Sequence, residues 1–233
     1  MALLFNGALN TSLLSISNQL TQNWISIGAV APELPDNLIG YIQSFEVKGH
    51  LAIGETHRGL ELIRRAWGWY LDNPFGTGST CIEGYLSDGT FGYRAATAYG
   101  NDYSYTSHAH GWSTGPTDGL TSYIVGLTIV QPGGSVWGFS PQFGDLEFAE
   151  AGFTTPLGKF FAKWSLTDDG FAVEWETPPT SKGRVVLPAV KEQKFKLVVD
   201  GKERVLNDGH FDEITRNLVI ESDGGPHSAR ISF

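Results

Sequence analysis

The stretch VGLTIVQPGG, residues 125–134, separates two parts of the sequence that differ in periodicity. Before it, apolar residues recur at the three- and four-residue intervals of amphipathic helices. After it, short runs alternate between apolar and polar residues, as strands with one buried face do. We therefore expect an α+β chain whose two units meet near residues 131–137, with domains at 1–134 and 135–233.

The part before the Pro-Gly-Gly turn is predicted to be helical. Its clearest helix covers about 56–72, where apolar residues follow helical spacing at Leu60, Ile63, Trp67 and Tyr70. Thr56 is a candidate N-cap, and Asn73-Pro74 should end this helix. Further helices are expected between the N-terminus and Trp24, over about 37–53, and from about Gly119.

Residues 75–115 interrupt the helical pattern. They are rich in Gly, Thr, Ser and Tyr and carry no strong periodicity. Long ordered loops in compact domains are usually functional. The glycines do not form a phosphate-binding loop, because GTGST at 76–80 lacks the required lysine.

The part after the turn is predicted to be an antiparallel β-sandwich. Turn signals separate its runs, namely Asp168-Asp169-Gly170, Asp200-Gly201 and Asp223-Gly224-Gly225. The alternating runs are residues 171–175, 184–187, 195–199, 218–220 and 229–233.

Composition limits the function classes. The 233 residues carry 16 Lys and Arg against 25 Asp and Glu, a net charge of −9, so we expect no nucleic-acid partner. One Cys excludes a disulfide framework within the chain and a Cys-rich zinc site. No apolar run approaches the ~20 residues of a membrane span, so no membrane partner is expected. The first twenty residues lack a positive n-region and are interpreted as an amphipathic helix instead of a signal peptide, which leaves the compartment open.

Glu83 is the carboxylate with the most informative surroundings. It lies among glycines and aromatic residues in GTGSTCIEGYLSDGTFGY, residues 76–93. A partly buried carboxylate there could act as a general base with a raised pKa. Alternatively, Glu83 caps a neighbouring backbone amide or points to water.

SHAHGWSTGP, residues 107–116, is the second candidate segment. Imidazoles exchange hydrogen bonds with hydroxyl groups, and a tryptophan ring offers a flat face to the C–H groups of a sugar. The alternative is a turn into a helix with Trp112 in the core. A metal site at Asp102, His108 and His110 has unsuitable spacing, and nothing fixes a hydrolytic triad of Ser107, His110 and Asp118. We expect no metal and no cofactor.

These segments resemble the C-terminal part of α-L-rhamnosidases of glycoside hydrolase family 78, most closely the fungal members. The resemblance extends over nearly the whole chain, and the HGWSxGP pattern is its most specific feature. It implies a partial (α/α)6 toroid, the end of a six-hairpin barrel, in residues 1–134, followed by a C-terminal antiparallel β-sandwich in 135–233. The segments that carry the resemblance are GAVAPELP (28–35), ELIRRAWGWYLDNP (61–74), STCIEGY (79–85), SHAHGWSTGP and VGLTIVQPGG.

The resemblance also implies site residues and a reaction. The family hydrolyses terminal α-L-rhamnose with inversion, using two carboxylates about 6.5–9.5 Å apart. Glu83 matches the general base, and His110 matches a histidine that contacts the bound sugar. Trp112 and Tyr85 are neighbouring candidates for substrate binding. The implied partner is a rhamnose-containing glycoside or oligosaccharide.

The family's general acid lies in earlier barrel segments, and residues 1–134 can supply only part of the twelve barrel helices. We therefore expect a fragment with the general base and without the acid, whose exposed helix faces would pack against the missing barrel half. The alternative is a non-catalytic carbohydrate-binding or barrel-completing module. A local acid would have to come from Glu46, Asp88, Asp102 or Asp118, none of which lies in a motif.

Overall fold

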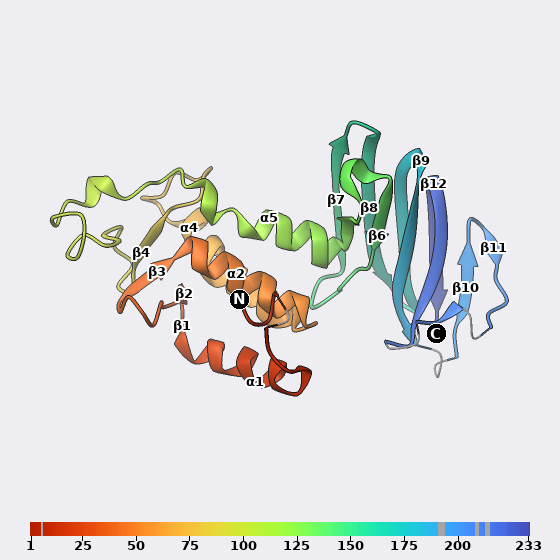
Figure 1. Ribbon diagram of the computed structural model, residues 1–233, viewed down its shortest axis with the longest axis horizontal. Helices are drawn as coiled ribbons and strands as arrows, with labels where there is room; N and C mark the ends of the chain where they lie inside the picture. The colour runs from red at the N-terminus through yellow and green to blue at the C-terminus, as the bar shows by residue number, and fades with distance from the viewer. Residues whose placement is uncertain (6, 191–193, 208–209, 213–214) are drawn as a thin grey trace. The chain divides into compact units, whose positions relative to one another are not determined.

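The computed structural model describes residues 1–5, 7–190, 194–207, 210–212 and 215–233 (Figure 1). They form two compact units, Met1–Gly119 (unit 1) and Leu120–Phe233 (unit 2). The chain combines helices with one large β-sheet, which is a mixed fold with a β-rich C-terminal part.

The division between the units falls earlier than the 134/135 boundary expected from the sequence. The short helix η5 (Leu120–Val125) belongs to unit 2, because the Trp164 indole N–H donates a hydrogen bond to the carbonyl of Ile124 at 2.9 Å. The assignment of the two parts as barrel and sandwich domains stays a prediction.

Unit 1 contains most of the helices and two small sheets. Its helices are α1 (Asn10–Leu20), η1 (Thr21–Asn23), α2 (Gly40–Ala52), α3 (Thr56–Ile63), the π-helical η2 (Arg64–Gly68), α4 (Trp69–Asp72), η3 (Tyr103–Tyr105), η4 (Gly111–Ser113) and α5 (Gly115–Gly119). Its strands are β1 (Trp24–Ile25), β2 (Gly28–Ala29), β3 (Asn37–Ile39) and β4 (Gly84–Leu86).

The helix expected over 56–72 is confirmed as the continuous run of α3, η2 and α4. Leu60, Leu62 and Tyr70 bury its apolar face. The run ends at Asn73, whose backbone is extended as expected before a proline. Thr56 is the first helical residue and Glu55 the N-cap, so the predicted cap was wrong by one position.

A small core joins the helices of unit 1 to the glycine-rich loop. Leu38 of β3 packs with Tyr70, Ile82 and Tyr85, and all four side chains are buried. Strands β3 and β4 pair antiparallel through Leu38 and Tyr85. The segment around Glu83 is therefore fixed directly beside the start of α2.

Unit 2 is built on an eight-stranded sheet in which β9 and β12 are the long central strands (Figure 1). The strand order is β11-β10-β12-β9-β6-β5, with β8 pairing the other half of β9 and β7 pairing β8. The strands are β5 (Leu127–Ile129), β6 (Val136–Phe139), β7 (Phe148–Thr155), β8 (Gly158–Thr167), β9 (Gly170–Val190), β10 (Lys196–Val199), β11 (Lys202–Glu203) and β12 (Asn217–Ser232), with the short helix η6 (Pro132–Gly134) between β5 and β6.

The expected turns at Asp168–Gly170 and Asp200–Gly201 are confirmed, whereas the one expected at Asp223–Gly225 is not. Asp200 and Gly201 both have positive φ, as a two-residue hairpin turn between β10 and β11 requires. Asp223-Gly224-Gly225 lies inside β12, at a shift of register against β9. The chain therefore continues there without reversing, and two pairs of predicted strands merge into β9 and β12.

The pairing in the described part of the sheet is antiparallel with one exception. Residues 136–139 of β6 pair parallel to 182–185 of β9, which corrects the expectation of a purely antiparallel arrangement. Gly183 makes this close approach possible, because a Cβ there would lie 2.1 Å from the Trp137 ring. The core of unit 2 includes Trp137, Phe139, Phe160, Trp164, Trp175, Val185 and Leu187.

No helix among the residues that the structure describes is long and apolar enough to cross a bilayer.

Candidate functional site

Two hydrogen bonds hold the carboxylate of Glu83. The Tyr99 hydroxyl donates to Oε1 at 3.0 Å, and the backbone N–H of Ser107 donates to Oε2 at 3.1 Å. A carboxylate has about four acceptor positions, so each oxygen keeps a lone pair for another donor. Glu83 does cap a backbone amide, as the alternative from the sequence foresaw, and it retains the capacity to accept a proton from water.

The Glu83 carboxylate affects the pKa of the Tyr99 hydroxyl. Burial, together with the hydrogen bond to Glu83, raises the pKa of the Tyr99 hydroxyl. The phenol therefore stays protonated at neutral pH and remains a hydrogen-bond donor to Oε1. The guanidinium of Arg94 lies 5.9 Å from the Tyr99 ring centroid and adds a positive charge to this neighbourhood.

The segments that carry Glu83 and His110 run side by side. The Glu83 N–H donates to the Ser107 carbonyl, and the His110 N–H donates to the Cys81 carbonyl, both at 2.8 Å. The Thr80 hydroxyl also donates to the His108 carbonyl. Backbone contacts therefore bring these two predicted site residues close together, although 27 positions separate them in sequence. That they face one cavity stays a prediction.

The helices of unit 1 fix the loop that follows His110. The Trp67 indole N–H donates to the Ser113 carbonyl at 2.7 Å, and the Gly115 N–H donates to Ser44 Oγ at 3.2 Å. A Cβ on Gly115 would lie 2.2 Å from that of Ser44, so only glycine allows this approach. The loop 107–115 is thus held on η2 and α2.

His110 and its neighbour His108 are held differently. Nδ1 of His108 lies 3.1 Å from the Tyr70 hydroxyl, and its ring packs edge-on against Phe91. The half-buried His110 ring makes no hydrogen bond to any of the described residues. Its ring nitrogens are therefore available to a ligand, whereas those of His108 are partly used.

Trp112 is an exposed side chain. It is 72% accessible, so the alternative of a core tryptophan was wrong. Its ring meets Tyr41 edge-on at 6.2 Å, and both residues line a shallow cavity of about 320 Å³ together with Phe45, Lys48 and Asp118. An exposed aromatic ring beside a cavity suits contact with a ligand.

Tyr85 is a core residue of unit 1, and its role in substrate binding stays a prediction. Its side chain is 2% accessible, its hydroxyl donates to the Ile27 carbonyl at 2.6 Å, and its ring packs on Trp69 at 4.4 Å. Burial strongly raises the pKa of the hydroxyl. The surface of unit 1 therefore exposes almost none of the Tyr85 side chain, which packs with Leu38, Tyr70 and Ile82.

The four carboxylates considered as a local general acid are engaged in hydrogen bonds or ion pairs with neighbouring residues. Hydrogen bonds from Thr90 lower the pKa of Asp88, and those from Ser104 lower the pKa of Asp102, whereas a general acid requires a raised pKa. Asp118 pairs with Lys48 at 3.2 Å. Glu46 accepts a hydrogen bond from the Trp24 indole and lies 3.5 Å from the buried His50.

The sequence did not indicate Tyr99 or Ser107 as partners of Glu83. They lie 16 and 24 positions away in a loop without periodicity. The only available signal was the local concentration of tyrosines around residue 100. Among the described residues, no group of three or more His, Cys, Asp or Glu side chains is arranged to hold a metal ion.

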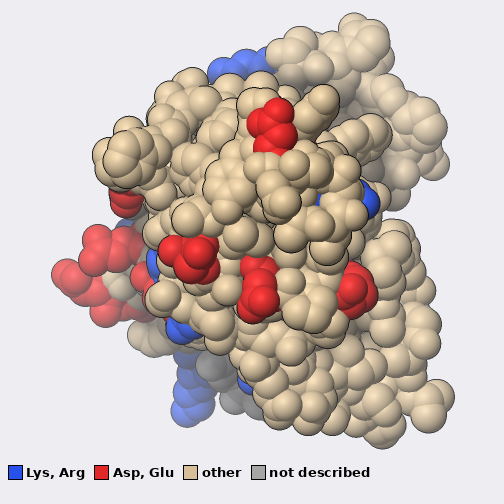
Figure 2. All heavy atoms as spheres, turned by 90° about the vertical axis from the view of Figure 1, so that its left-hand side faces the viewer, with Lys and Arg blue, Asp and Glu red and all other residues tan. Residues whose placement is uncertain are grey.

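The surface of unit 1 that faces the viewer in Figure 2 is mostly uncharged, with scattered acidic side chains and few basic ones. Within residues 75–115 the charged side chains are Glu83, Asp88, Arg94 and Asp102. A surface of this kind favours a neutral, hydrogen-bonding ligand over a polyanion.

Comparisons with known proteins find a family model that matches part of unit 2 and solved structures that share the fold over most of the chain. Residues 126–202 match the family model of the bacterial alpha-L-rhamnosidase C-terminal domain. The α-L-rhamnosidase of Aspergillus terreus is 20% identical with a TM-score of 0.62, over 95% of this chain and 21% of its own. That of Streptomyces avermitilis, solved with L-rhamnose, is 19% identical with a TM-score of 0.60, over 80% of this chain and 17% of its own.

A family 78 rhamnosidase from Bacillus sp. GL1 is 24% identical with a TM-score of 0.53, over 64% of this chain and 15% of its own. At these identities the solved structures share the fold with this chain, which spans about a fifth of their length or less. No curated protein matches the chain in a sequence search. The predicted resemblance to the C-terminal part of α-L-rhamnosidases is confirmed.

Proposed function

We propose that this chain is the C-terminal part of an inverting α-L-rhamnosidase and that it supplies the general base, Glu83. In this proposal residues 1–134 form the end of an (α/α)6 barrel, and residues 135–233 form the β-sandwich domain that follows it. The substrate is a glycoside or oligosaccharide with a terminal α-L-rhamnose. The general acid comes from a preceding barrel segment.

The observation that carries the proposal is the fixed Glu83 carboxylate beside the His110 loop. Tyr99 and the Ser107 amide orient the carboxylate from one side and leave lone pairs on both oxygens. A water molecule at one of those lone pairs could lose its proton to Glu83 while its oxygen attacks the anomeric carbon. Attack from the face opposite the leaving group gives inversion.

His110 and Trp112 are the proposed sugar contacts. The His110 imidazole has no hydrogen-bond partner among the described residues, so it can exchange hydrogen bonds with rhamnose hydroxyls. The exposed Trp112 ring can pack against the C–H face of the sugar. Rhamnose is proposed because the matched C-terminal domain belongs to α-L-rhamnosidases and the Streptomyces avermitilis relative was solved with L-rhamnose.

A second candidate is a module that completes a barrel or binds carbohydrate without catalysis. It is favoured by exposed apolar side chains near α1, where Phe5 is 64%, Leu9 76% and Leu14 53% accessible. Such a face is suited to packing against further helices. Both candidates require partner helices, and they differ in whether Glu83 takes part in chemistry.

The test joins this chain to the preceding part of the Aspergillus terreus α-L-rhamnosidase, and this chimera is called the completed enzyme below. Release of 4-nitrophenol from 4-nitrophenyl α-L-rhamnoside is measured for the completed enzyme and for this chain alone. We expect turnover by the completed enzyme and its loss in Glu83→Gln. Unchanged turnover in Glu83→Gln would leave the barrel-completing role as the function.

A further inference from the structure

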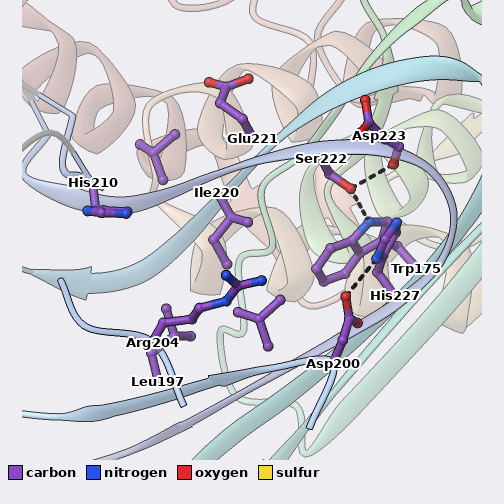
Figure 3. A pocket seen from close by; sticks show the side chains of 12 residues that line it. Trp175, Leu197, Asp200, Arg204, His210, Ile220, Glu221, Ser222, Asp223 and His227 are labelled. Atoms are coloured by element: carbon purple, nitrogen blue, oxygen red, sulfur yellow. Dashed lines mark hydrogen bonds and ion pairs between the residues drawn. The ribbon is translucent and has the colours of Figure 1, made fainter. Parts of the chain in front are cut away.

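Unit 2 contains a cavity that the proposed chemistry of unit 1 does not use. It has a volume of about 490 Å³ and lies against β9, β10 and β12, beside the chain that follows β11 (Figure 3). This volume is within the usual range of small-molecule binding pockets, about 300–1,000 Å³. The cavity is large enough for one sugar ring.

One wall of the cavity is apolar. Leu197, Val199 and Ile220 line it, and Trp175 lies at one end. The Trp175 indole N–H donates to Ser222 Oγ at 3.0 Å, and the His227 ring stacks on the indole with centroids 5.6 Å apart. Figure 3 shows Trp175, Ser222 and His227 grouped at one end of the cavity. Trp175, Leu197 and Val199 are at most 6% accessible, so they back the cavity, and among the apolar residues named here only Ile220 offers more surface to a ligand.

Three carboxylates in the lining of the cavity are hydrogen-bond acceptors. Asp200 accepts hydrogen bonds from His227 Nδ1 and from the Ser228 amide, each at 2.9 Å. Glu221 and Asp223 of β12 add two further carboxylates to the lining. A ligand that presents O–H groups would find acceptors here.

Arg204 supplies a hydrogen-bond donor to the cavity. The Arg204 guanidinium makes no hydrogen bond or ion pair with the described residues, and Figure 3 shows it pointing into the cavity between the two sides. The Arg204 backbone N–H donates to the Leu197 carbonyl at 2.9 Å, which fixes the residue beside β10. The cavity therefore has donors and acceptors facing a common space.

The balance of charge indicates the class of ligand. Three carboxylates against one guanidinium disfavour an anion, whereas the Arg204 guanidinium, which has no ion-pair partner among the described residues, disfavours a cation. Hydroxyl groups can bond to the carboxylates and to the guanidinium alike, because each O–H donates one hydrogen bond and accepts others. We propose that this cavity binds one neutral pyranose unit of a glycan, with Arg204 and Asp200 as the residues that recognise its hydroxyls.

The experiment titrates the full chain with the methyl glycosides of D-glucose, D-galactose and L-rhamnose and follows amide and indole NMR signals. We expect saturable shifts at Trp175 and in β12 with at least one of them. Arg204→Met and Asp200→Asn should each weaken that binding roughly tenfold or more, since each removes a hydrogen bond that involves a charged group. Arg230→Met is the matched control, because Arg230 is on β12, pairs with Asp169 and does not line the cavity.

Three outcomes would overturn the proposal. The first is the absence of saturable shifts in unit 2 with all three glycosides. The second is tighter binding of D-glucuronate than of methyl glucoside, which would indicate an anion site. The third is equal binding by Arg204→Met and the Arg230→Met control. A sugar signal that responds only to His110→Ala would belong to unit 1, so this test is separate from that of the proposed function.

Discussion

At the scale of single residues, the proposed function depends on Glu83 as the general base. Glu83→Gln keeps the size of the side chain and can still accept the hydrogen bonds of Tyr99 or Ser107, but an amide cannot take a proton from water. We expect kcat of the completed enzyme to fall by about 10²–10⁴-fold while substrate binding persists. Steady-state kinetics measure this, and Glu33→Gln, an exposed substitution in the same unit, is the control. A normal kcat in Glu83→Gln would place the base elsewhere.

His110 should behave differently, because its proposed role is binding. Removing its imidazole in His110→Ala deletes hydrogen bonds to the sugar and leaves the Glu83 carboxylate in place. We expect KM of the completed enzyme to rise roughly tenfold, with a smaller fall in kcat. His108→Ala provides the comparison, since that ring contacts Tyr70 and Phe91 instead. Equal effects of the two substitutions would indicate that both act through the shape of the loop.

The sequence indicated two segments that the structure brings together, those of Glu83 and His110, whereas the roles of these residues stay predictions. Glu83 and His110 lie in distinctive local segments, so each could be chosen from its own neighbours. Tyr99 and the Ser107 amide are set by long-range contacts in an aperiodic loop, which no local pattern encodes. The burial of Tyr85 could not be predicted either, because the pairing of β4 with β3 places its ring in the core.

At the scale of elements, glycines mark where two segments pack too closely for a side chain. A Cβ on Gly183 of β9 would meet the Trp137 ring of β6 at 2.1 Å. We expect Gly183→Ala to destabilise unit 2 by about 3 kcal/mol, because the buried ring or the strand must move. Denaturant unfolding followed by near-UV circular dichroism measures this.

Gly68→Ala is the control for this substitution. Gly68 lies in the helical run of unit 1, and a Cβ there meets no atom within 4 Å. Alanine in a helix interior is better than glycine by roughly 0.5–1 kcal/mol, so this variant should be neutral or slightly more stable. A Gly183→Ala variant as stable as Gly68→Ala would mean that the β6–β9 pairing is looser than described.

Elements were predictable where one local rule dominates. The helical run 56–72 follows from apolar spacing and from the proline that comes after it. The turn follows from the pair Asp200-Gly201, which adopts the two positive φ angles that such a turn requires. The long strands were not predictable, since Pro178-Pro179 and Gly224-Gly225 are usual turn signals. In the sheet these pairs lie opposite each other at the shift of register, so β9 and β12 continue through them.

At the scale of the units, the stability of unit 2 should depend on pH through Asp200. Burial alone would raise the pKa of its carboxyl, but hydrogen bonds from His227 and Ser228, with the charges of His227 and Arg204, lower it. A folded pKa below the unfolded value of about 3.9 stabilises the fold above that pH. This contribution is lost as the pH falls through the folded pKa.

Asp200→Asn tests that dependence. We expect it to lower the thermal midpoint of unit 2 at neutral pH, and its difference from the unmodified chain should vanish once the pH is below the folded pKa of Asp200. Calorimetry across this range measures the difference, and Asp168→Asn, an exposed substitution at the neighbouring hairpin, is the control. A difference that stays constant with pH would assign the effect to packing instead of charge.

The whole chain should not release rhamnose by itself. Asp88 and Asp102 have lowered pKa values, Asp118 is paired with Lys48, and Glu46 is engaged by Trp24, so none of these four is suited to protonate a leaving group. We expect 4-nitrophenol release by the chain alone at the level of the buffer. Substantial turnover by the chain alone would mean that one of its own residues is the acid.

The most direct test of the account uses azide with Glu83→Ala in the completed enzyme and 4-nitrophenyl α-L-rhamnoside. Azide is a nucleophile that needs no base, and the deleted side chain leaves room for it opposite the leaving group. The account predicts that hydrolysis is lost, that azide restores turnover, and that NMR identifies the product as the inverted β-L-rhamnosyl azide. An α-configured azide, or a folded variant that binds substrate but does not respond to azide, would contradict the role of Glu83 as the base.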